Sequence, residues 1–539
     1  MASTHDVANQ PPPLTEYDVF GSDLALVEGV ERHEAGWALE QLTDLGRRAG
    51  TPEAQEWGRL ANTNPPRLVT HDRYGNRIDE VEFHPAWHSL MSVAVGAGLH
   101  ASPWRDPRPG AQVARAAGFA VWGHTEGGHG CPISMTHAAV PALRADPVLA
   151  AEWIPRLTSL NYDPLLRVPA DKAGCLAGMG MTEKQGGSDV RSNTTVATPV
   201  ADGTYRLSGH KWFTSAPMCD LFLVLAQAPG GLTCFVVPRV LPDGERNPFR
   251  IQRLKDKLGN RSNASSEPEF DDTVGWRLGA EGRGVATIIE MVSMTRLDCV
   301  LGSATIMRAS VANATHHARY RMAFGRHLVD QPLMLAVLAD LAVESEAATT
   351  LMVRLAAAID HDETAFKRLA LAVGKYWVCK RGTAVAAEAL ECLGGNGYVE
   401  DFPMARIYRE APLNSIWEGS GNVNALDVLR ALGREPGVWE AFRDELTLAV
   451  GADPRLDHAI NELDRDLAES TEIEARARRL VERMALTLQG SLLVRFAPPA
   501  VADAFCASRL GGDWGHTFGT MPTGVSARAI VERATPKVA

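Results

Sequence analysis

The sequence predicts a mainly helical α+β protein with a helical N-terminal domain, a central β domain, a helical bundle and a helical C-terminal appendage. At 539 residues the chain is long for one hydrophobic core, so two to four domains are expected. Short runs of β-branched and aromatic residues, separated by turn dipeptides, occupy the middle of the chain. Ala-, Leu- and Arg-rich stretches with helical periodicity lie on both sides.

The expected domain boundaries follow these changes in pattern. Residues 1–173 contain helical stretches such as 24–48, joined by long loops. Residues 174–284 form the expected β domain, because the apolar runs 221–225 and 233–237 have the composition of strands.

Helical periodicity returns after the β domain. Residues 285–435 contain the long segments 333–359 and 364–393, which are expected to form a bundle. Residues 436–539 follow a break that contains Gly and Pro, and they hold at least two more helical segments. This C-terminal domain is a candidate for DNA binding.

Charge and composition narrow the classes of function. The chain has 65 Asp and Glu against 54 Lys and Arg, a net charge of -11, so any contact with DNA would be a local patch. The eight cysteines form no C-x-x-C pair, which argues against a zinc ribbon or a disulfide scaffold. No apolar run reaches the roughly twenty residues of a membrane span. Because the polar, Pro-rich start also lacks a signal-peptide pattern, we expect a cytoplasmic protein with no membrane partner.

A glycine-rich loop at residues 178–189 reads G-M-G-M-T-E-K-Q-G-G-S-D. Its glycines let the backbone approach a ligand closely, and Thr182 and Ser188 add hydroxyls beside exposed amides, which suits a flavin ring edge and a pyrophosphate. A glycine-rich hairpin connection without a ligand is the alternative. The third glycine of the dinucleotide-binding fingerprint is missing, so a nicotinamide enzyme is not expected.

A second motif, I-W-E-G-S-G-N at residues 416–422, lies more than two hundred residues further along the chain. Together the two motifs resemble the flavin-binding loop and the catalytic-glutamate loop of the acyl-CoA dehydrogenase superfamily. Because the first motif contains Lys184 and Gln185 and the second contains Trp417, the two motif sequences are most similar to those of the AidB, or alkylation-response, branch. The resemblance covers nearly the whole chain. It implies an acyl-CoA dehydrogenase-like fold, bound FAD, an acyl-CoA-type ligand and a homotetramer.

The same resemblance implies which residues of the β domain contact the flavin. From the glycine-rich loop they are Met181, Thr182, Gly187 and Ser188. In the segment H-K-W-F-T-S, Trp212 and Phe213 are expected to cover the isoalloxazine, and Thr214 or Ser215 to contact its polar edge. Taken alone, Trp212 would be a core aromatic.

Two further segments are similar to those with which a neighbouring subunit holds the adenosine half of FAD. They contribute Arg321 and Phe324 from R-M-A-F-G-R, and Gly394 and Gly395 from E-C-L-G-G-N-G-Y. A guanidinium offers a phosphate a bidentate fork, and the glycines let backbone amides approach it. Without the resemblance, Arg321 would be a solvated helix charge and the glycines a helix C-cap.

Glu418 is the candidate catalytic base. A carboxylate beside the apolar residues Ile416 and Trp417 is expected to have a raised pKa, in the range useful for removing a proton next to a thioester carbonyl. In the family this glutamate takes the α-proton while the β-hydrogen leaves as hydride to the flavin. The residues of this motif expected to contact the flavin are Trp417, Ser420, Gly421 and Asn422. Arg296 aligns with an arginine near the family's substrate channel, and an ordinary helix ion pair is the alternative.

One cluster has the residue types of a metal site. His124, Glu126, His129 and Cys131 crowd into eight positions. Gly127 and Gly128 interrupt them and no second ligand pair follows, so no metal is expected.

One helical face of the appendage is the candidate contact to double-stranded DNA. It carries Arg476, Arg479 and Arg483 at helical spacing. Interleaved glutamates make a solvated, salt-bridged helix the alternative. Residues 441–539 hold twelve Lys and Arg against fourteen Asp and Glu, so the appendage is not basic overall.

Two hypotheses for function follow. The first is an enzyme that carries out α,β-dehydrogenation of a short or branched acyl thioester and passes the electrons to an acceptor that the sequence does not name. This enzyme could serve an alkylation or DNA-damage response. The second hypothesis is a DNA-binding protective flavoprotein in which dehydrogenase activity is weak or vestigial. The intact Glu418 favours the first hypothesis, whereas the appendage and the AidB-like wording favour the second.

Overall fold

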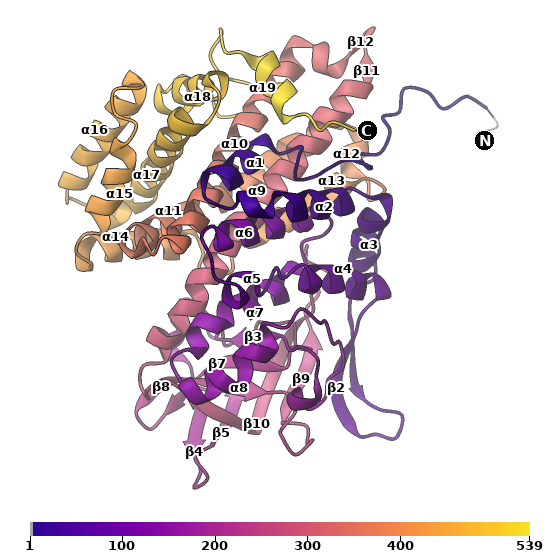
Figure 1. The fold of residues 1–539 in the computed structure, drawn as a ribbon, viewed down its shortest axis with the longest axis vertical. Helices are drawn as coiled ribbons and strands as arrows, with labels where there is room; N and C mark the ends of the chain where they lie inside the picture. Colours follow the sequence, from indigo (N-terminus) through magenta and orange to yellow (C-terminus); the bar gives the residue numbers. More distant parts are fainter. Residues whose placement is uncertain (1–3, 539) are drawn as a thin grey trace. The chain divides into compact units, whose positions relative to one another are not determined.

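The fold was obtained as a computed structural model, which describes residues 4–538. The chain forms two compact units, each built from segments that are distant in the sequence (Figure 1). Unit 1 takes in the described chain up to Pro52, the segment Pro109–His124 and the chain from Cys299 onward; unit 2 takes in Glu53–Arg108 and Thr125–Asp298. The four domain boundaries expected from the sequence stay a prediction.

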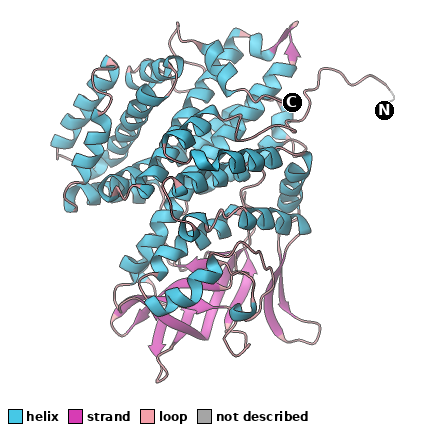
Figure 2. Ribbon diagram, viewed as in Figure 1, coloured by secondary structure: helices cyan, strands magenta, loops and turns pink. Residues whose placement is uncertain are grey.

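The predicted mainly helical α+β class is confirmed. Helices make up most of the described chain, and the large sheet belongs to unit 2 (Figure 2). No helix in residues 4–538 combines the length and the apolar character that crossing a membrane requires.

Eight strands of unit 2 form one sheet. They are β3 (Ala177–Gly180), β4 (Val196–Pro199), β5 (Tyr205–His210), β6 (Thr214–Ser215), β7 (Leu221–Ala228), β8 (Gly231–Pro238), β9 (Phe249–Leu254) and β10 (Ser265–Leu278). The order runs β3-β7-β4-β5-β10-β6, with β8 paired to β7 and β10, and β9 paired to β10. The two predicted strands are confirmed as β7 and β8, which form an antiparallel hairpin with Leu225 opposite Cys234. Both are almost completely buried, as their unbroken apolar runs require.

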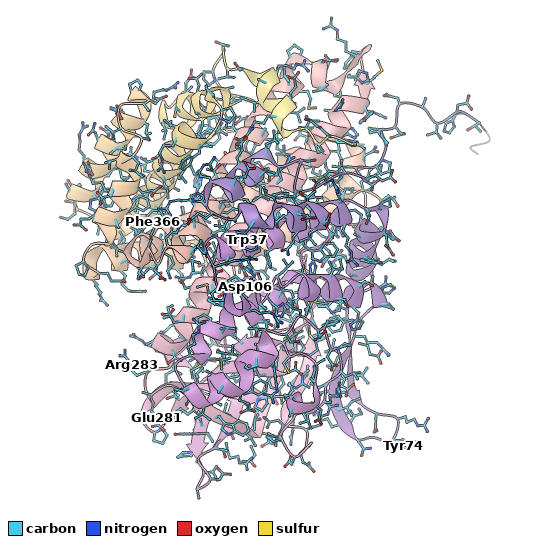
Figure 3. All side chains as sticks on the ribbon, viewed as in Figure 1. Trp37, Tyr74, Asp106, Glu281, Arg283 and Phe366 are labelled. Carbon is cyan, nitrogen blue, oxygen red and sulfur yellow. The ribbon has the colours of Figure 1, made fainter. Side chains whose placement is uncertain are left out.

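A two-stranded hairpin, β1 (Arg67–His71) and β2 (Arg77–Glu82), lies in the region for which only helices were expected. Its strands are short, polar and mostly half-exposed, so they lack the apolar alternation by which a strand is found. Asp72 closes the turn by accepting hydrogen bonds from the amides of Tyr74 and Asn76. Tyr74 lies at the end of this hairpin (Figure 3).

Helices accompany the sheet in unit 2. They are α3 (Pro52–Thr63), α4 (Pro85–Gly96), α5 (Ser102–Arg105), α7 (Gly130–Leu143) and α8 (Pro147–Leu157), with the 3-10 turns η2 (Pro169–Asp171) and η3 (Val190–Ser192). Asp146 caps α8 by accepting from the amides of Val148 and Leu149, directly before Pro147 in the first turn. The helix α7 packs on β3, where the hydroxyl of Thr136 accepts from the Ala177 amide.

Unit 1 is a helical assembly. Its helices before the appendage are α1 (Leu24–Arg32), η1 (Gly36–Ala38), α2 (Leu39–Ala49), α6 (Ala111–Gly123), α10 (Pro332–Asp360), α11 (Thr364–Cys392), α12 (Gly395–Tyr398), α13 (Pro403–Glu410), η5 (Ala411–Ser415) and α14 (Gly421–Arg434). A small hairpin, β11 (Met322–Ala323) and β12 (Arg326–His327), precedes η4 (Leu328–Asp330). The helix α9 (Gly284–Tyr320) begins in unit 2 and belongs to unit 1 from Cys299.

The appendage is part of unit 1. It comprises α15 (Val438–Thr447), α16 (Pro454–Ala468), α17 (Ile473–Phe496), α18 (Pro499–Phe505), the π-helical turn η6 (Cys506–Leu510) and α19 (Ala527–Ala534). Phe366 on α11, labelled in Figure 3, stacks on Phe442 of α15, and the ring centroids are 6.2 Å apart. Arg509 forms ion pairs with Asp340 and Glu344, and all three side chains are buried. Buried side chains of the appendage therefore contact buried side chains of α10 and α11 in the bundle.

Candidate functional site

Two segments of unit 2 that were predicted to contact the flavin lie side by side. The amide of Trp212 donates to the carbonyl of Thr182 at 2.8 Å, and the amide of Lys184 donates to Nε2 of His210 at 3.0 Å. The fold thus joins the loop that follows β3 to the segment between β5 and β6.

Glycine is required in the loop because other atoms occupy the space of a side chain. A Cβ at position 187 would stand 2.5 Å from the hydroxyl oxygen of Thr182, and one at position 178 would stand 2.3 Å from the ring of Phe222. Gly186 has a φ of +147°, which L side chains rarely adopt. These glycines allow Thr182 and the strand to pack closely.

A buried ion pair that the sequence reasoning missed holds the same loop. Lys211 Nζ lies 2.7 Å from Oε1 of Glu183. Burial by itself raises the pKa of Glu183, but the hydrogen bond from Lys211 and those from Thr194 and Thr195 outweigh it and hold the pKa well below its usual range. Its signal in the sequence was a charged residue inside the glycine-rich motif and another just before Trp212.

The aromatic pair of this site is only partly covered. Phe213 is 53% exposed and Trp212 is half-buried, so Trp212 is not a fully buried core aromatic. Lys255 Nζ stands 3.4 Å from the centroid of the Trp212 ring. The hydroxyl of Thr214 is buried and has no hydrogen-bond partner among the described residues, and Ser215 follows it, half-buried. A buried hydroxyl without a partner fits a ligand with a polar edge.

The loop with Glu418 belongs to unit 1 and connects η5 to α14. Glu418 has a φ of +57° and Gly419 a φ of +96°, both in the left-handed region. Two side chains hold the loop: the indole of Trp417 donates to Oδ1 of Asn414 at 3.0 Å, and the side-chain amide of Asn424 donates to the carbonyl of Gly419 at 2.6 Å. A non-glycine residue in this conformation costs about 1 to 3 kcal/mol, and it persists where its surroundings enforce it.

Ile416 was expected to shield Glu418 from water, and in the single chain it does not. Ile416 is 63% exposed, while Trp417 is half-buried. Because the hydrogen bond of Trp417 to Asn414 turns the indole towards η5, only one of the two apolar neighbours lies against the protein.

The two segments predicted to hold adenosine both hydrogen-bond to the N-terminal segment of the chain, at Asn9 and Gln10. Arg321 Nη1 donates to the carbonyl of Asn9 at 2.5 Å, and the side chain of Asn9 exchanges two hydrogen bonds with the backbone of Met322. Asn396, next to Gly395, donates to Gln10 at 3.1 Å. Asn9 and Gln10 were not predicted as site residues, since a polar N-terminus carries no motif.

The remaining predicted adenosine residues differ in exposure. Phe324 stands at the tip of the β11–β12 hairpin and is 99% exposed. Gly394 has a φ of +59° directly before α12, where a glycine is the favoured residue.

The arginine face of α17 is largely engaged inside the appendage. Arg483 pairs with Asp466 of α16, and Arg476 lies 3.5 Å from the same carboxylate while also donating to the carbonyls of Asp466 and Glu469. Arg479 is exposed. These contacts favour the salt-bridged alternative for Arg476 and Arg483. Most other arginines of the appendage form separate ion pairs, such as that of Arg495 with Glu445, and Arg478 donates to the hydroxyl of Tyr376.

The cluster considered for a metal has other roles. Within residues 4–538, no group of His, Cys, Asp and Glu has the arrangement of a metal site. Glu126 accepts hydrogen bonds from the amides of Gly128 and His129 and from the hydroxyl of Ser262. His124 lines a small cavity of unit 1, and burial together with Arg308 lowers its pKa to about 3.

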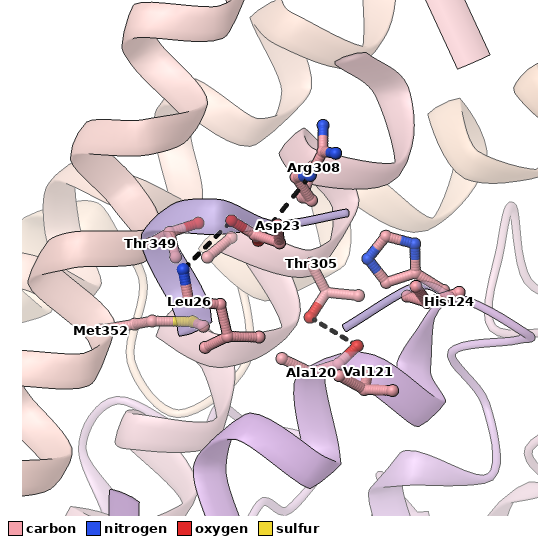
Figure 4. A pocket seen from close by; sticks show the side chains of 11 residues that line it. Asp23, Leu26, Ala120, Val121, His124, Thr305, Arg308, Thr349 and Met352 are labelled. Carbon is pink, nitrogen blue, oxygen red and sulfur yellow. Dashed lines mark hydrogen bonds and ion pairs between the residues drawn. The ribbon is translucent and has the colours of Figure 1, made fainter. Parts of the chain in front are cut away.

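That cavity lies between α1, α6, α9 and α10 (Figure 4). Its volume is about 10 Å³, room for about one water molecule. Asp23 and Arg308 line it and form an ion pair, and the hydroxyl of Thr305 donates to the carbonyl of Ala120 (Figure 4). The cavity is too small for a flavin or a thioester.

The chain has the domain composition of an acyl-CoA dehydrogenase-type protein. Residues 178–273 match the acyl-CoA dehydrogenase middle domain and residues 282–433 the acyl-CoA dehydrogenase C-terminal domain. Residues 9–164 match the N-terminal domain of adaptive response protein AidB. The chain is 48% identical to the putative acyl-CoA dehydrogenase AidB of Escherichia coli, over 93% of this chain and 94% of that protein. It belongs to the AidB branch of the acyl-CoA dehydrogenase family.

Solved structures share the fold. Caenorhabditis elegans ACDH-11 in complex with C11-CoA has a TM-score of 0.88 and 26% identity, and the match covers 95% of this chain and 94% of that one. An acyl-CoA dehydrogenase of Bacillus anthracis complexed with FAD has a TM-score of 0.66 and 16% identity, with 84% and 86% of the two chains covered. At 16% identity this likeness shows the fold alone.

Proposed function

We propose that this chain is an FAD-dependent dehydrogenase that introduces an α,β double bond into the acyl group of an acyl-CoA thioester, with Glu418 as the base. The backbone of Glu418 carries the proposal: a non-glycine residue is held at a φ of +57° between two helices by side-chain hydrogen bonds. A conformation that the surroundings enforce at such a cost is typical of functional sites.

Relatives support the ligand and the cofactor. The ACDH-11 structure holds C11-CoA, and the matches of this chain to the middle and C-terminal domains of acyl-CoA dehydrogenases support FAD as the cofactor. The buried, unpartnered hydroxyl of Thr214 fits the polar edge of a flavin ring. The residues of unit 2 proposed to hold the cofactor are Met181, Thr182, Gly187, Ser188, Trp212, Phe213, Thr214 and Ser215. Those of unit 1 are Arg321, Phe324, Gly394, Gly395, Trp417, Ser420, Gly421 and Asn422.

The proposed chemistry divides the two hydrogens lost by the acyl group. The carboxylate of Glu418 takes a proton from the α-carbon, which the thioester carbonyl acidifies. A bound flavin supplies the two-electron oxidant that receives the β-hydrogen as hydride. The electron pair released at the α-carbon becomes the new double bond, and Glu418 ends the step as a carboxylic acid. A short or branched acyl chain is the proposed substrate, and a separate acceptor reoxidises the protein.

A homotetramer is part of the proposal. Phe324 is 99% exposed, and Leu333 and Tyr398 of the same unit are 85% and 81% exposed. A neighbouring chain that covered these side chains would remove their apolar area from water, which favours association. Arg321 and Phe324 would then contribute to the cofactor site of a neighbouring subunit.

Anaerobic titration of the purified protein with a panel of acyl-CoAs tests the proposal. The panel contains short, branched and C11 thioesters, and the absorbance of oxidised flavin is followed. Rapid bleaching by one class supports the proposal and names the substrate. A yellow protein that no thioester bleaches argues against the dehydrogenase, and a colourless protein that does not take up FAD contradicts the whole proposal.

Association with DNA is the second candidate function. The adaptive-response name of the matched N-terminal family supports it, as does the exposed Arg479 on the appendage. Retention on immobilised double-stranded DNA, measured at graded salt, tests it, because phosphate contacts weaken as salt rises.

A further inference from the structure

Lys375 is a lysine buried in the middle of α11, where its ammonium group points at the loop that carries Glu418. The residue is 1% exposed. Its Nζ donates to the carbonyl of Asn414 at 2.7 Å and to the carbonyl of Gly419 at 2.8 Å. The two carbonyls lie on either side of Glu418 in the sequence, so one side chain holds both ends of the loop.

A buried ammonium group is costly, and the fold usually supplies a carboxylate for it. Two other buried lysines follow this rule: Lys172 pairs with Asp220 and Lys211 with Glu183, each at 2.7 Å. Lys375 instead has backbone carbonyls as its partners. Hydrogen bonds from a charged donor are about twice as strong as neutral ones, so the cost is offset at this loop.

The loop needs such an anchor because its backbone is strained. Glu418 and Gly419 both have left-handed φ values, of +57° and +96°. Asn424 also donates to the carbonyl of Gly419, but its second bond goes to Ser420, on the same side of Glu418. The indole of Trp417 donates to Asn414, on the other side of Glu418. Lys375 hydrogen-bonds on both sides of Glu418 and so ties the two sides of the strained turn to each other.

We infer that Lys375 is a positioning residue for the candidate base: by tying Asn414 and Gly419 to α11, it sets where the carboxylate of Glu418 stands. The inference rests on the proposed function, since it takes Glu418 to be the base. A displacement of about 1 Å in a catalytic group costs on the order of 100-fold in rate. Loss of Lys375 should therefore slow the chemical step without weakening thioester binding.

The test compares the variants Lys375→Met and Lys375→Ala with the wild type. Reduction of the bound flavin by the best acyl-CoA is followed anaerobically by stopped flow, which separates the limiting rate from the dissociation constant. We expect a limiting rate about 100-fold lower, with the dissociation constant and the FAD content unchanged. Ethylammonium should restore part of the rate of Lys375→Ala, because it fits the space left by the side chain and carries the same charge.

Lys367→Met is the matched control, because Lys367 is a half-exposed lysine on the same helix. It should keep the wild-type rate and show no response to ethylammonium. Hydrogen exchange of residues 413–424 gives a readout that needs no turnover: it should become faster in Lys375→Met and stay unchanged in Lys367→Met.

The outcomes separate the two ideas. A Lys375→Met protein that reduces its flavin at the wild-type rate overturns the inference, as does one whose FAD content and thioester affinity fall in step with its rate. A wild type that no thioester reduces, or a Glu418→Gln variant that keeps the wild-type rate, contradicts the proposed function instead. In that case unchanged hydrogen exchange in Lys375→Met also excludes Lys375 as the anchor of the loop.

Discussion

Lys211 and Glu183 form an ion pair that is completely buried in unit 2, with 2.7 Å between Nζ and Oε1. Lys211 also donates to the carbonyl of Leu225 on β7, and Glu183 accepts from the amides of Thr194 and Thr195. The pair therefore connects Glu183 in the glycine-rich loop to a core strand and to the chain that follows the loop. It makes the loop part of the core although the loop itself is largely exposed.

Glu183→Gln should destabilise the protein by about 3 to 5 kcal/mol, because it leaves the ammonium of Lys211 buried without its charge partner. Chemical denaturation followed by circular dichroism measures the loss. Glu82→Gln is the control: it breaks the exposed pair of Arg67 and Glu82, which should contribute no more than about 1 kcal/mol. Equal losses in the two variants would contradict a special role for the buried pair.

The buried pair also predicts a dependence of stability on pH. The pKa of Glu183 lies below its ordinary value of 4.5 in the folded protein, because Lys211 and the loop donors outweigh the effect of burial. On unfolding, the carboxylate returns to that ordinary value, so its contribution is present above about pH 5 and is lost as the pH falls below that range. The stability difference between wild type and Glu183→Gln should shrink between pH 6 and pH 3, measured by urea unfolding; a constant difference would argue against the assignment.

Glu418→Gln should keep FAD and lower the rate of flavin reduction by about 100-fold to 10,000-fold, the usual contribution of a general base. The measurement is stopped-flow bleaching by the acyl-CoA that reduces the wild type. Glu400→Gln removes an exposed carboxylate of the same unit that pairs with Arg409, and it should leave the rate unchanged. A Glu418→Gln protein with wild-type kinetics would remove Glu418 as the base.

Arg321→Ala should weaken FAD binding by about 10-fold to 100-fold, the value of one hydrogen bond from a charged group. The measurement is flavin fluorescence during titration of the deflavinated protein. Asn9→Ala should have a smaller effect in the same direction, because Asn9 orients Arg321 and the backbone of Met322. Arg319→Ala, which changes an exposed arginine of α9, is the control and should bind FAD like the wild type.

Phe324→Ser should weaken self-association, since burying one phenylalanine side chain contributes about 1.5 to 3 kcal/mol and symmetry repeats the contact. Sedimentation velocity over a range of concentrations measures the effect. Leu448→Ser removes another exposed apolar side chain, in the appendage, and should leave the oligomer intact. If both variants sediment like the wild type, the hairpin is not at a subunit interface.

On the DNA hypothesis, Arg479→Ala should reduce the slope of log affinity against log salt by about 1, the loss of one phosphate contact. Arg483→Ala should instead lower stability, because Arg483 is already paired with Asp466. Fluorescence anisotropy with a labelled duplex at several salt concentrations distinguishes the two. Unchanged binding in Arg479→Ala would leave the arginine face of α17 as an ordinary salt-bridged surface.

Sequence patterns predicted the elements whose side chains are buried along their whole length. The apolar runs of β7 and β8 and the long periodic segments of α10 and α11 were all found from their composition. The hairpin of β1 and β2 was missed because its strands are short and polar, and the stretch 24–48 was not resolved into α1 and α2 with η1 between them. An element that is stabilised mainly by contacts with distant segments has a weak pattern of apolar residues, so its secondary structure is hard to predict from the sequence.

The sequence by itself determined the family, the mainly helical α+β class and the motifs, because glycine spacing and apolar periodicity are local properties of the chain. Only the tertiary structure revealed the contacts of these motifs. Lys211 pairs with Glu183 of the first motif, and Lys375 hydrogen-bonds to the loop of the second. Arg321 donates to the carbonyl of Asn9, and Arg483 pairs with Asp466. Each of these relationships joins residues that are separated in the sequence, and a buried lysine finds its partner only once the backbone has folded around it. For Lys211 and Lys375 the partner must also offset the cost of burying a charged group, and no local pattern records that cost.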